Sequence, residues 1–264
     1  MPIFIIAVIL GLLEGITEFL PISSTGHLIV AERILDFKDI KDIFTVVIQL
    51  GAIAAVLWFY RVDLLDKIRG LFAKEAAALR FWKILIIGTI PAGVVGLLLN
   101  DSLDKLTKPH VIAWALIIGG IILWLVDRQP VTRAAKPRVE TVTARQALLV
   151  GAGQCLAIIP GVSRSGATIV SGIGAGMDRP TATALSFYLS IPVLVLASGL
   201  KLVKNPQAIG QLDGGVTALI IGMICAFITA LLSISLLLHY VSRHNFRPFA
   251  YYRVALGILI LIFM

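Results

Sequence analysis

The chain has 264 residues, of which 58% are hydrophobic and only 14% are charged. A typical soluble domain is about 25% charged, so this composition excludes an ordinary soluble domain. It predicts an integral membrane protein, whose surrounding solvent is largely lipid. The net charge of +8 is spread over short segments between apolar runs, which favours a role in membrane orientation over nucleic-acid binding.

The chain opens with an apolar region, residues 3–30, which a polar stretch interrupts. Glu14 and Glu18 precede the sequence Pro-Ile-Ser-Ser-Thr-Gly-His at residues 21–27. Each apolar half is shorter than the roughly 20 residues that a membrane-spanning helix needs. Two short apolar runs around a Gly/Ser-rich turn favour a re-entrant helical hairpin over a full span. Residues 147–173 show the same pattern, with Gln154 and a second polar turn at 160–168.

Six further apolar segments are long enough, or nearly so, to cross a membrane. Three of them follow each interrupted region. We therefore predict an all-α integral membrane protein with six transmembrane helices plus two re-entrant helical hairpins. The predicted spans are Ile43–Tyr60, Phe81–Leu99, Val111–Val126, Ala184–Leu200, Val216–Leu238 and Phe249–Met264.

An internal repeat relates the two halves of the chain at an offset of 140 residues. The offset continues without a gap from the hairpins through the three spans of each half. We predict one membrane domain over residues 1–264, with a first repeat at 1–130 and a second, inverted repeat at 141–264. The matched pairs are Gly11 with Gly151, Glu14 with Gln154, Ser23 with Ser163, Thr25 with Ser165 and Gly26 with Gly166.

The basic residues predict the topology through the positive-inside rule. Segments 61–83, 128–145 and 241–253 hold 14 of the 23 Lys and Arg residues. These segments are expected in the cytoplasm, and the loops that alternate with them are expected outside. Because each half has three spans, the halves have opposite orientations. The first hairpin then enters from outside and the second from the cytoplasm, so that their tips meet near the midplane.

The first hairpin carries three side chains suited to chemistry. A spacing of four places Glu14 and Glu18 on one helix face. Two carboxylates inside a membrane repel each other, and a divalent cation with oxygen ligands is their natural partner. The alternative is a pair that reaches the interface and has no role. His27, which ends the turn, either exchanges protons, acts as a nucleophile or is structural.

The second hairpin carries Arg164, the strongest single signal in the sequence. An arginine between two serines in a Gly-rich turn needs an anionic partner, and a guanidinium binds phosphate bidentately. Glycines let the backbone wrap closely around such a group, and the N–H groups that open the next helix favour an anion. The alternative partner is Glu14 or Glu18. The residues expected around the phosphate are Ser23, Thr25, Gly161, Ser163, Ser165, Gly166 and Thr168.

Two stretches also carry a family resemblance. Residues 14–27, Glu-Gly-Ile-Thr-Glu-Phe-Leu-Pro-Ile-Ser-Ser-Thr-Gly-His, resemble the first signature of the undecaprenyl-diphosphatase family, the bacitracin-resistance proteins. Residues 160–168, Pro-Gly-Val-Ser-Arg-Ser-Gly-Ala-Thr, look like its second signature. The resemblance covers essentially the whole chain. It implies hydrolysis of undecaprenyl diphosphate to undecaprenyl phosphate in the bacterial inner (plasma) membrane, with a divalent cation such as magnesium or calcium as cofactor.

Several mechanisms fit this resemblance. The nucleophile is Ser24 activated by His27, His27 itself, or water. Arg164 holds the diphosphate, while Glu14 and Glu18 bind the cation or Glu18 acts as a base. The predicted catalytic residues are thus Glu18, Ser24, His27 and Arg164, and the predicted metal ligands are Glu14 and Glu18.

One functional alternative is a transporter or flippase of a polyprenyl phosphate lipid, because inverted repeats with broken helices are typical of transporters. The expected partners are a polyprenyl diphosphate lipid and the membrane, with no nucleic acid. Small residues at Gly88–Gly96 and Gly119-Gly120 can pack helices within or between chains, which leaves a homodimer open. The biology of the substrate suggests an active site open to the periplasmic face.

Overall fold

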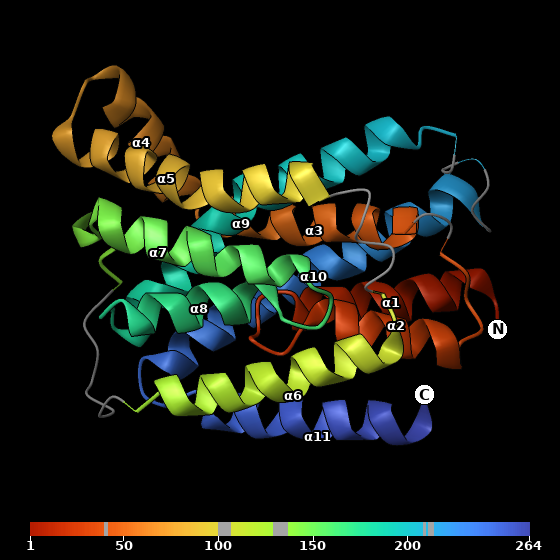
Figure 1. Ribbon diagram of the computed structural model, residues 1–264. Coiled ribbons are helices and arrows are strands. Elements are labelled where there is room, and N and C mark those ends of the chain that lie inside the picture. The colour runs from red at the N-terminus through yellow and green to blue at the C-terminus, as the bar shows by residue number, and fades with distance from the viewer. Residues whose placement is uncertain (40–41, 100–106, 129–136, 208–209, 211–213) are drawn as a thin grey trace.

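The computed structural model describes residues 1–39, 42–99, 107–128, 137–207, 210 and 214–264. This described part contains helices, turns and bends but no β-strand (Figure 1). Two 3-10 segments, η3 (Val139–Thr141) and η4 (Cys155–Ile158), accompany the α-helices. The α-helices are α1 (Ile3–Thr17), α2 (Ser24–Ile34), α3 (Ile43–Phe59), α4 (Arg61–Phe72), α5 (Ala76–Leu99), α6 (Pro109–Val126), α7 (Ala144–Gln154), α8 (Arg164–Gly174), α9 (Arg179–Lys204), α10 (Gly215–Val241) and α11 (Arg247–Phe263).

Four of the described helices, α5, α6, α9 and α10, are long and apolar enough to cross a membrane. A fifth span results if α3 and α4, which are bent by 71° at their junction, are counted together. The sixth predicted span corresponds to α11, which has 17 residues. The chain is therefore an all-α, multi-pass membrane protein, as the composition predicts.

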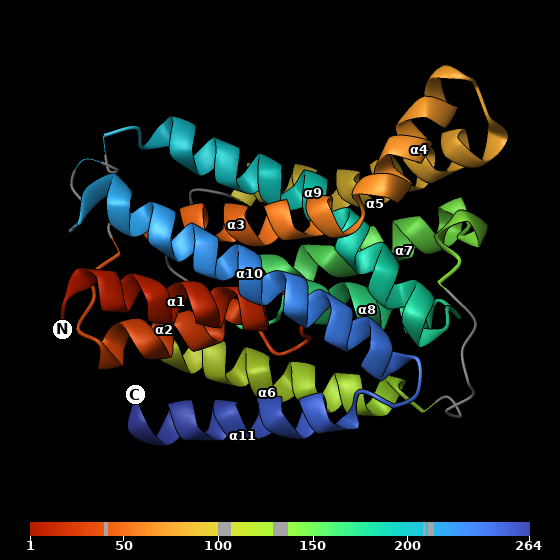
Figure 2. The same ribbon diagram turned by 180° about the vertical axis from the view of Figure 1, so that it is seen from behind.

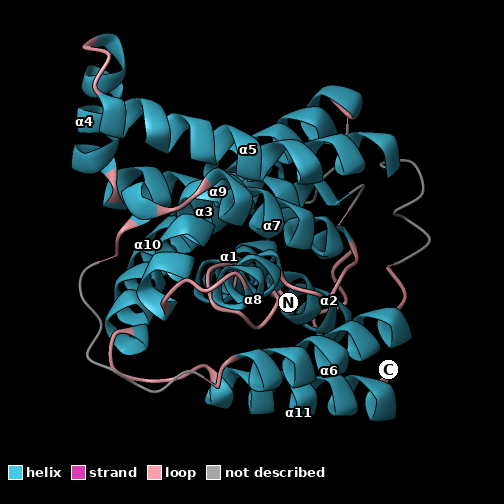
Figure 3. Cartoon of the chain, turned by 60° about the vertical axis from the view of Figure 1, so that its left-hand side comes forward, coloured by secondary structure: helices cyan, strands magenta, loops and turns pink. Residues whose placement is uncertain are grey.

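Both interrupted regions fold as pairs of short helices, α1 with α2 and α7 with α8. In Figure 1 the two pairs enter the bundle from opposite ends, and their connecting turns meet near its middle. The chain termini lie at the end from which α1 and α2 enter. Seen from another side, α1 and α8 are nearly end-on at the centre of the molecule (Figure 3). This arrangement brings together residues that are far apart in the sequence.

The two turns have the same backbone conformation at matched positions. Ser23 has a φ of 72° and Ser163 a φ of 73°, a region that residues other than glycine seldom adopt. Each serine also caps the helix that follows, because its hydroxyl accepts a hydrogen bond from the N–H of Gly26 or Gly166. The two serines thus share one local geometry at positions that the sequence predicts to match.

The hairpins pack against helices of the opposite half, α1 on α10 and α7 on α5 (Figure 2). Gly11 of α1 lies against Gly222, and a Cβ at Gly11 would lie 2.3 Å from the Gly222 carbonyl oxygen. Gly151 of α7 lies in the same way against Gly88, where a Cβ would lie 2.5 Å from the carbonyl oxygen. Only glycine permits such close helix approach, and here it serves contacts within the chain.

Two segments predicted as cytoplasmic loops are in part helical. Residues 61–72 form α4, which an ion pair between Asp63 and Lys67 supports across one helical turn. Arg253, counted with the segment 241–253, is instead buried inside α11 and is 1% exposed. Four basic residues used in the topology prediction, and the predicted end of the first repeat at residue 130, lie outside the described residues. The basic residues are Lys41, Lys105, Arg133 and Lys136.

Candidate active site

The carboxylates of the first hairpin lie where α1 ends. Glu18 continues the helical conformation for one residue beyond Thr17, and its N–H donates to the carbonyl of Glu14 at 2.9 Å. Both glutamates are buried, Glu14 at 1% and Glu18 at 6% exposure. The predicted common helix face is therefore confirmed. The chain leaves the helix just before Pro21, which cannot continue the backbone hydrogen-bond pattern.

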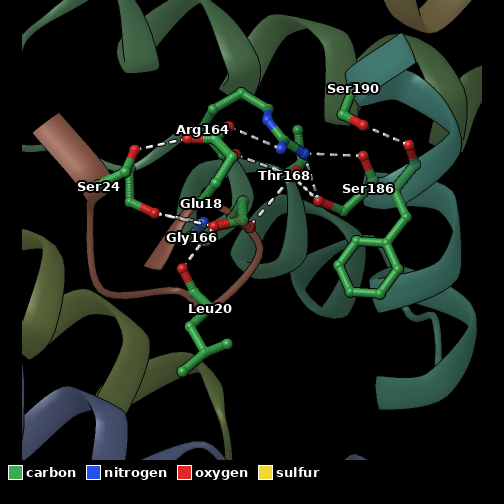
Figure 4. Close-up of polar contacts among 11 residues, drawn as sticks. Glu18, Leu20, Ser24, Arg164, Gly166, Thr168, Ser186 and Ser190 are labelled. Atoms are coloured by element: carbon green, nitrogen blue, oxygen red, sulfur yellow. Dashed lines mark hydrogen bonds and ion pairs between the residues drawn. The ribbon is translucent and has the colours of Figure 1, made fainter. Parts of the chain in front are cut away.

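Glu18 joins the two turns through both of its carboxylate oxygens (Figure 4). Its Oε1 accepts a hydrogen bond from Nη2 of Arg164 at 3.0 Å, and its Oε2 accepts one from the hydroxyl of Ser24 at 2.5 Å. Removal of one partner from a buried ion pair strongly destabilises the folded protein, because the other charge is left buried and unpaired. A serine hydroxyl that donates to a buried carboxylate is also positioned to transfer its proton there.

Arg164 opens α8 and has a second partner that the sequence analysis missed. Its Nη1 donates to the carbonyl oxygen of Ser186 on α9 at 2.9 Å and to the Ser186 hydroxyl at 3.3 Å. Thr168 donates to the same Ser186 hydroxyl at 2.7 Å (Figure 4). A signal for Ser186 does exist in the sequence, since it lies one helical turn from Ser190 in an apolar span. Small polar residues in spans usually face neighbouring helices.

Three residues that were predicted to bind phosphate, Ser163, Ser165 and Gly166, form hydrogen bonds that fix the second turn. The Ser163 hydroxyl accepts from the N–H of Gly166 at 3.0 Å and lies 3.0 Å from the hydroxyl of Ser165. Ser165 in turn donates to the carbonyl of Leu20, in the first turn, at 2.8 Å. These side chains hold the two turns together, and they present the guanidinium of Arg164 on a fixed backbone.

Arg253 of α11 also links the two turns, and the sequence analysis missed it. Its guanidinium donates to the carbonyl of Pro21 in the first turn at 3.2 Å. It donates to the carbonyls of Gly161 and Val162 in the second turn at 3.2 and 2.8 Å. Further bonds reach the α6 backbone. Gly119 leaves room for this side chain, because a Cβ there would lie 2.1 Å from its Nη2.

His27 is bonded to groups other than the hydroxyl that it was expected to activate. Its Nδ1 lies 2.7 Å from the carbonyl of Ser23, and a carbonyl only accepts, so Nδ1 carries the proton. Its Nε2 then accepts from the hydroxyl of Tyr252 at 2.7 Å. The Ser24 hydroxyl is bonded to Glu18 instead. The structure thus places Glu18, not His27, next to Ser24.

A cavity of about 1050 Å³ opens beside the turns, a volume suited to a sizeable ligand. Of the predicted site residues, Glu14, His27, Ser165, Gly166 and Thr168 are not in its wall. Apolar residues of α5 and α9 form much of the remaining wall, and Lys201, Lys204 and Asn205 lie where α9 ends. The predicted residues that do line the cavity are Glu18, Ser23, Ser24, Thr25, Gly161, Ser163 and Arg164.

The donor set fits a divalent cation only in part. Glu14 has a buried Oε1 with no hydrogen-bond partner, whereas both oxygens of Glu18 are bonded. Among the described residues, no group of three or more His, Cys, Asp and Glu side chains could hold a metal ion. Magnesium is often bound by one or two carboxylates together with substrate phosphates and water. The two glutamates fit a cation of that kind, not one enclosed by protein ligands.

Comparison with known proteins identifies the family to which this chain is similar. The family model described as "Bacitracin resistance protein BacA" matches residues 7–259, which include both turns and Arg253. An undecaprenyl-diphosphatase of Deinococcus deserti is 46% identical over 98% of this chain and 94% of that protein. One from Deinococcus radiodurans is 44% identical over 97% and 93%. One from Nitrosospira multiformis is 46% identical over 96% and 92%.

Proposed function

This chain belongs to the bacitracin resistance protein BacA family, and on that premise we propose that it is an undecaprenyl-diphosphatase. It hydrolyses undecaprenyl diphosphate to undecaprenyl phosphate and inorganic phosphate, which recycles the lipid carrier for peptidoglycan synthesis and confers bacitracin resistance. The observation that carries the proposal is the buried carboxylate of Glu18, bonded at once to Ser24 and Arg164. The relatives are named as phosphatases, so the transporter or flippase alternative is not favoured.

Substrate binding follows from the two kinds of wall in the cavity. Arg164 holds the terminal phosphate with charge-assisted hydrogen bonds, for which its guanidinium is well suited. The apolar wall, with Ala92 and Leu97 of α5 and Val193 and Leu196 of α9, accommodates part of the polyprenyl tail. A cavity that is polar at the turns and apolar along the helices matches an amphipathic lipid.

Ser24 is the nucleophile that the geometry supports best. Its oxygen attacks the terminal phosphorus as its proton passes to Oε2 of Glu18, 2.5 Å away. The bond from that phosphorus to the bridging oxygen breaks, and undecaprenyl phosphate leaves. Water then hydrolyses the phosphoserine, the proton on Glu18 returns to the Ser24 oxygen, and inorganic phosphate is released. Attack by His27 is less favoured, because both of its ring nitrogens are bonded.

We include a divalent cation, magnesium or calcium, in the proposal. Glu14, with its unpartnered Oε1, and Glu18 would hold it together with the diphosphate. When bound, such a cation neutralises negative charge on the phosphoryl oxygens. The glutamates of this chain would otherwise repel the diphosphate, and Arg164 would offset part of that repulsion at the turns.

We further propose a six-span inverted repeat in the bacterial inner membrane. The entry of the two hairpins from opposite ends of the bundle supports it (Figure 1). The cavity extends to Lys201 and Asn205, in a segment poorer in basic residues than the segments predicted in the cytoplasm. By the positive-inside rule this end faces the periplasm. A homodimer stays a prediction.

The test is phosphate release from undecaprenyl diphosphate by the protein purified in detergent. We expect the wild type to release phosphate and Arg164→Ala to be slower by about 10³-fold, because an electrostatic contact to the reacting phosphate is lost. Arg164→Lys, which keeps the charge but not the planar fork, is the matched control and should fall between them. A wild type that binds the lipid but releases no phosphate would reject the proposal.

A further inference from the structure

Gln154, the last residue of α7, is buried without any partner for its amide. It is 1% exposed, and neither its Nε2 nor its Oε1 has a hydrogen-bond partner. Buried side-chain amides are normally paired, since their burial is otherwise unfavourable. Gln154 lines the same cavity as Glu18, Ser24 and Arg164. Gln154 therefore belongs to the wall of the space where a ligand would bind, with its unpaired amide atoms buried in that wall.

The backbone around Gln154 is held closely on both sides. Gly151 lies against Gly88 of α5, where a Cβ would lie 2.5 Å from the carbonyl oxygen. Gly153 lies against Ser171 of α8, where a Cβ would lie 1.8 Å from the hydroxyl oxygen. The 3-10 segment η4 begins directly after Gln154. The amide thus sits on a fixed backbone, as a binding residue should.

The predicted internal repeat relates Gln154 to a residue of the first hairpin with different chemistry. Gln154 matches Glu14, whose Oε1 is also buried without a partner. The first hairpin has a carboxylate at this position, and the second has a neutral amide with two N–H donors. A second carboxylate would add to the repulsion of an anionic ligand, whereas an amide can donate to it.

We propose that Gln154 contacts the diphosphate group directly and that its Nε2 donates a hydrogen bond to a phosphate oxygen. This inference rests on the proposed function and deepens it, because it assigns a neutral donor to the headgroup site beside Arg164. Its Oε1 is available to accept from a water molecule or from a protonated phosphate oxygen. The ligand class is a diphosphate monoester, with inorganic pyrophosphate as its soluble mimic.

The test compares two glutamines of the same helix. Gln154→Met keeps the size of the side chain and removes its hydrogen bonding. We expect an unchanged or higher melting temperature, because no partner is lost, and a KM for undecaprenyl diphosphate raised by about 10- to 100-fold with a smaller change in kcat. The rise in melting temperature that inorganic pyrophosphate gives to the wild type should shrink in this variant.

Gln146→Met is the matched control. Gln146 has partners for both ends of its amide, since Oε1 accepts from the N–H of Thr143 at 3.0 Å and Nε2 donates to the carbonyl of Ala175 at 3.1 Å. It does not line the cavity. Its replacement should lower the melting temperature and leave KM and the pyrophosphate response as in the wild type.

The outcomes separate this inference from the proposed function. If the wild type releases no phosphate, the proposed function fails whatever Gln154 does. If the wild type is active and Gln154→Met has an unchanged KM, the inference alone is overturned. A melting temperature that falls as far as that of Gln146→Met, or loss of folded protein in both Gln154→Met and Gln154→Leu, would show a structural amide and would also overturn it.

Discussion

The two polar turns have one backbone conformation and two different sets of side chains. Ser23 and Ser163 share a positive φ near 72° and cap the next helix in the same way. At the next position the first turn has Ser24 and the second has Arg164. Where the first has His27, the second has Ala167. The same backbone conformation thus carries different side chains in the two turns.

The difference assigns complementary tasks to the two turns. The first hairpin presents two carboxylates, Glu14 and Glu18, and the hydroxyl of Ser24. The second presents donors, the guanidinium of Arg164 and the amide of Gln154. A site with carboxylates on both sides would repel a diphosphate, and one with arginines on both sides would lack a base. An inverted repeat can place one set of each kind around a single ligand.

Ser24→Ala tests this division most strongly, because it removes the proposed nucleophile from the first turn. We expect kcat for phosphate release to fall by about 10³-fold or more with a small change in KM. The variant keeps the ion pair of Glu18 with Arg164 but leaves the buried Oε2 of Glu18 without its donor, so the melting temperature should fall slightly. Near-normal turnover would reject the serine route, and His27→Ala would then be the variant to measure.

Arg253→Met tests the link between the two turns. It leaves the carbonyls of Pro21, Gly161 and Val162 without their donor, and we expect a loss of about 3 kcal/mol or more in the free energy of unfolding. The measurement is denaturant unfolding in detergent. Arg253→Lys should recover part of the loss. A stability equal to the wild type would mean that the turns meet without this side chain.

Glu14→Gln tests the acidic side of the comparison by making the two repeat positions identical. A chelator should stop phosphate release by the wild type, and added magnesium or calcium should restore it. The variant should need a cation concentration at least about tenfold higher, because affinity depends on the number of charged ligands. Activity that survives chelation in the wild type would exclude the cation from the proposal.

Ser23→Gly and Ser163→Gly should have the smallest effects, and they compare the two turns at their matched serines. Each loses a helix cap but relieves a positive φ, so the free energy of unfolding should change by only about 1 kcal/mol. Ser163→Gly should cost slightly more, because Ser163 also contacts the Ser165 hydroxyl at 3.0 Å. Thermal unfolding of the pair measures both, and a difference of several kcal/mol would contradict the equivalence of the turns.

The sequence by itself determined the class of the protein, the two polar turns and the common face of Glu14 and Glu18. These features are local: they depend on the length of apolar runs, on helical spacing and on contiguous motifs. Family membership is likewise established from the sequence, by a match over residues 7–259.

Only the tertiary structure decided which of these groups meet. Arg164 pairs with Glu18 across 146 residues of sequence, a contact that exists because hairpins from opposite ends pack turn against turn. The sequence predicts Arg253 in a loop beside Tyr252. In the structure α11 packs on α6, and Arg253 is buried between the two turns. His27 lies three residues from Ser24 but turns toward Tyr252. Such pairings depend on how distant helices pack, which no spacing along the chain specifies.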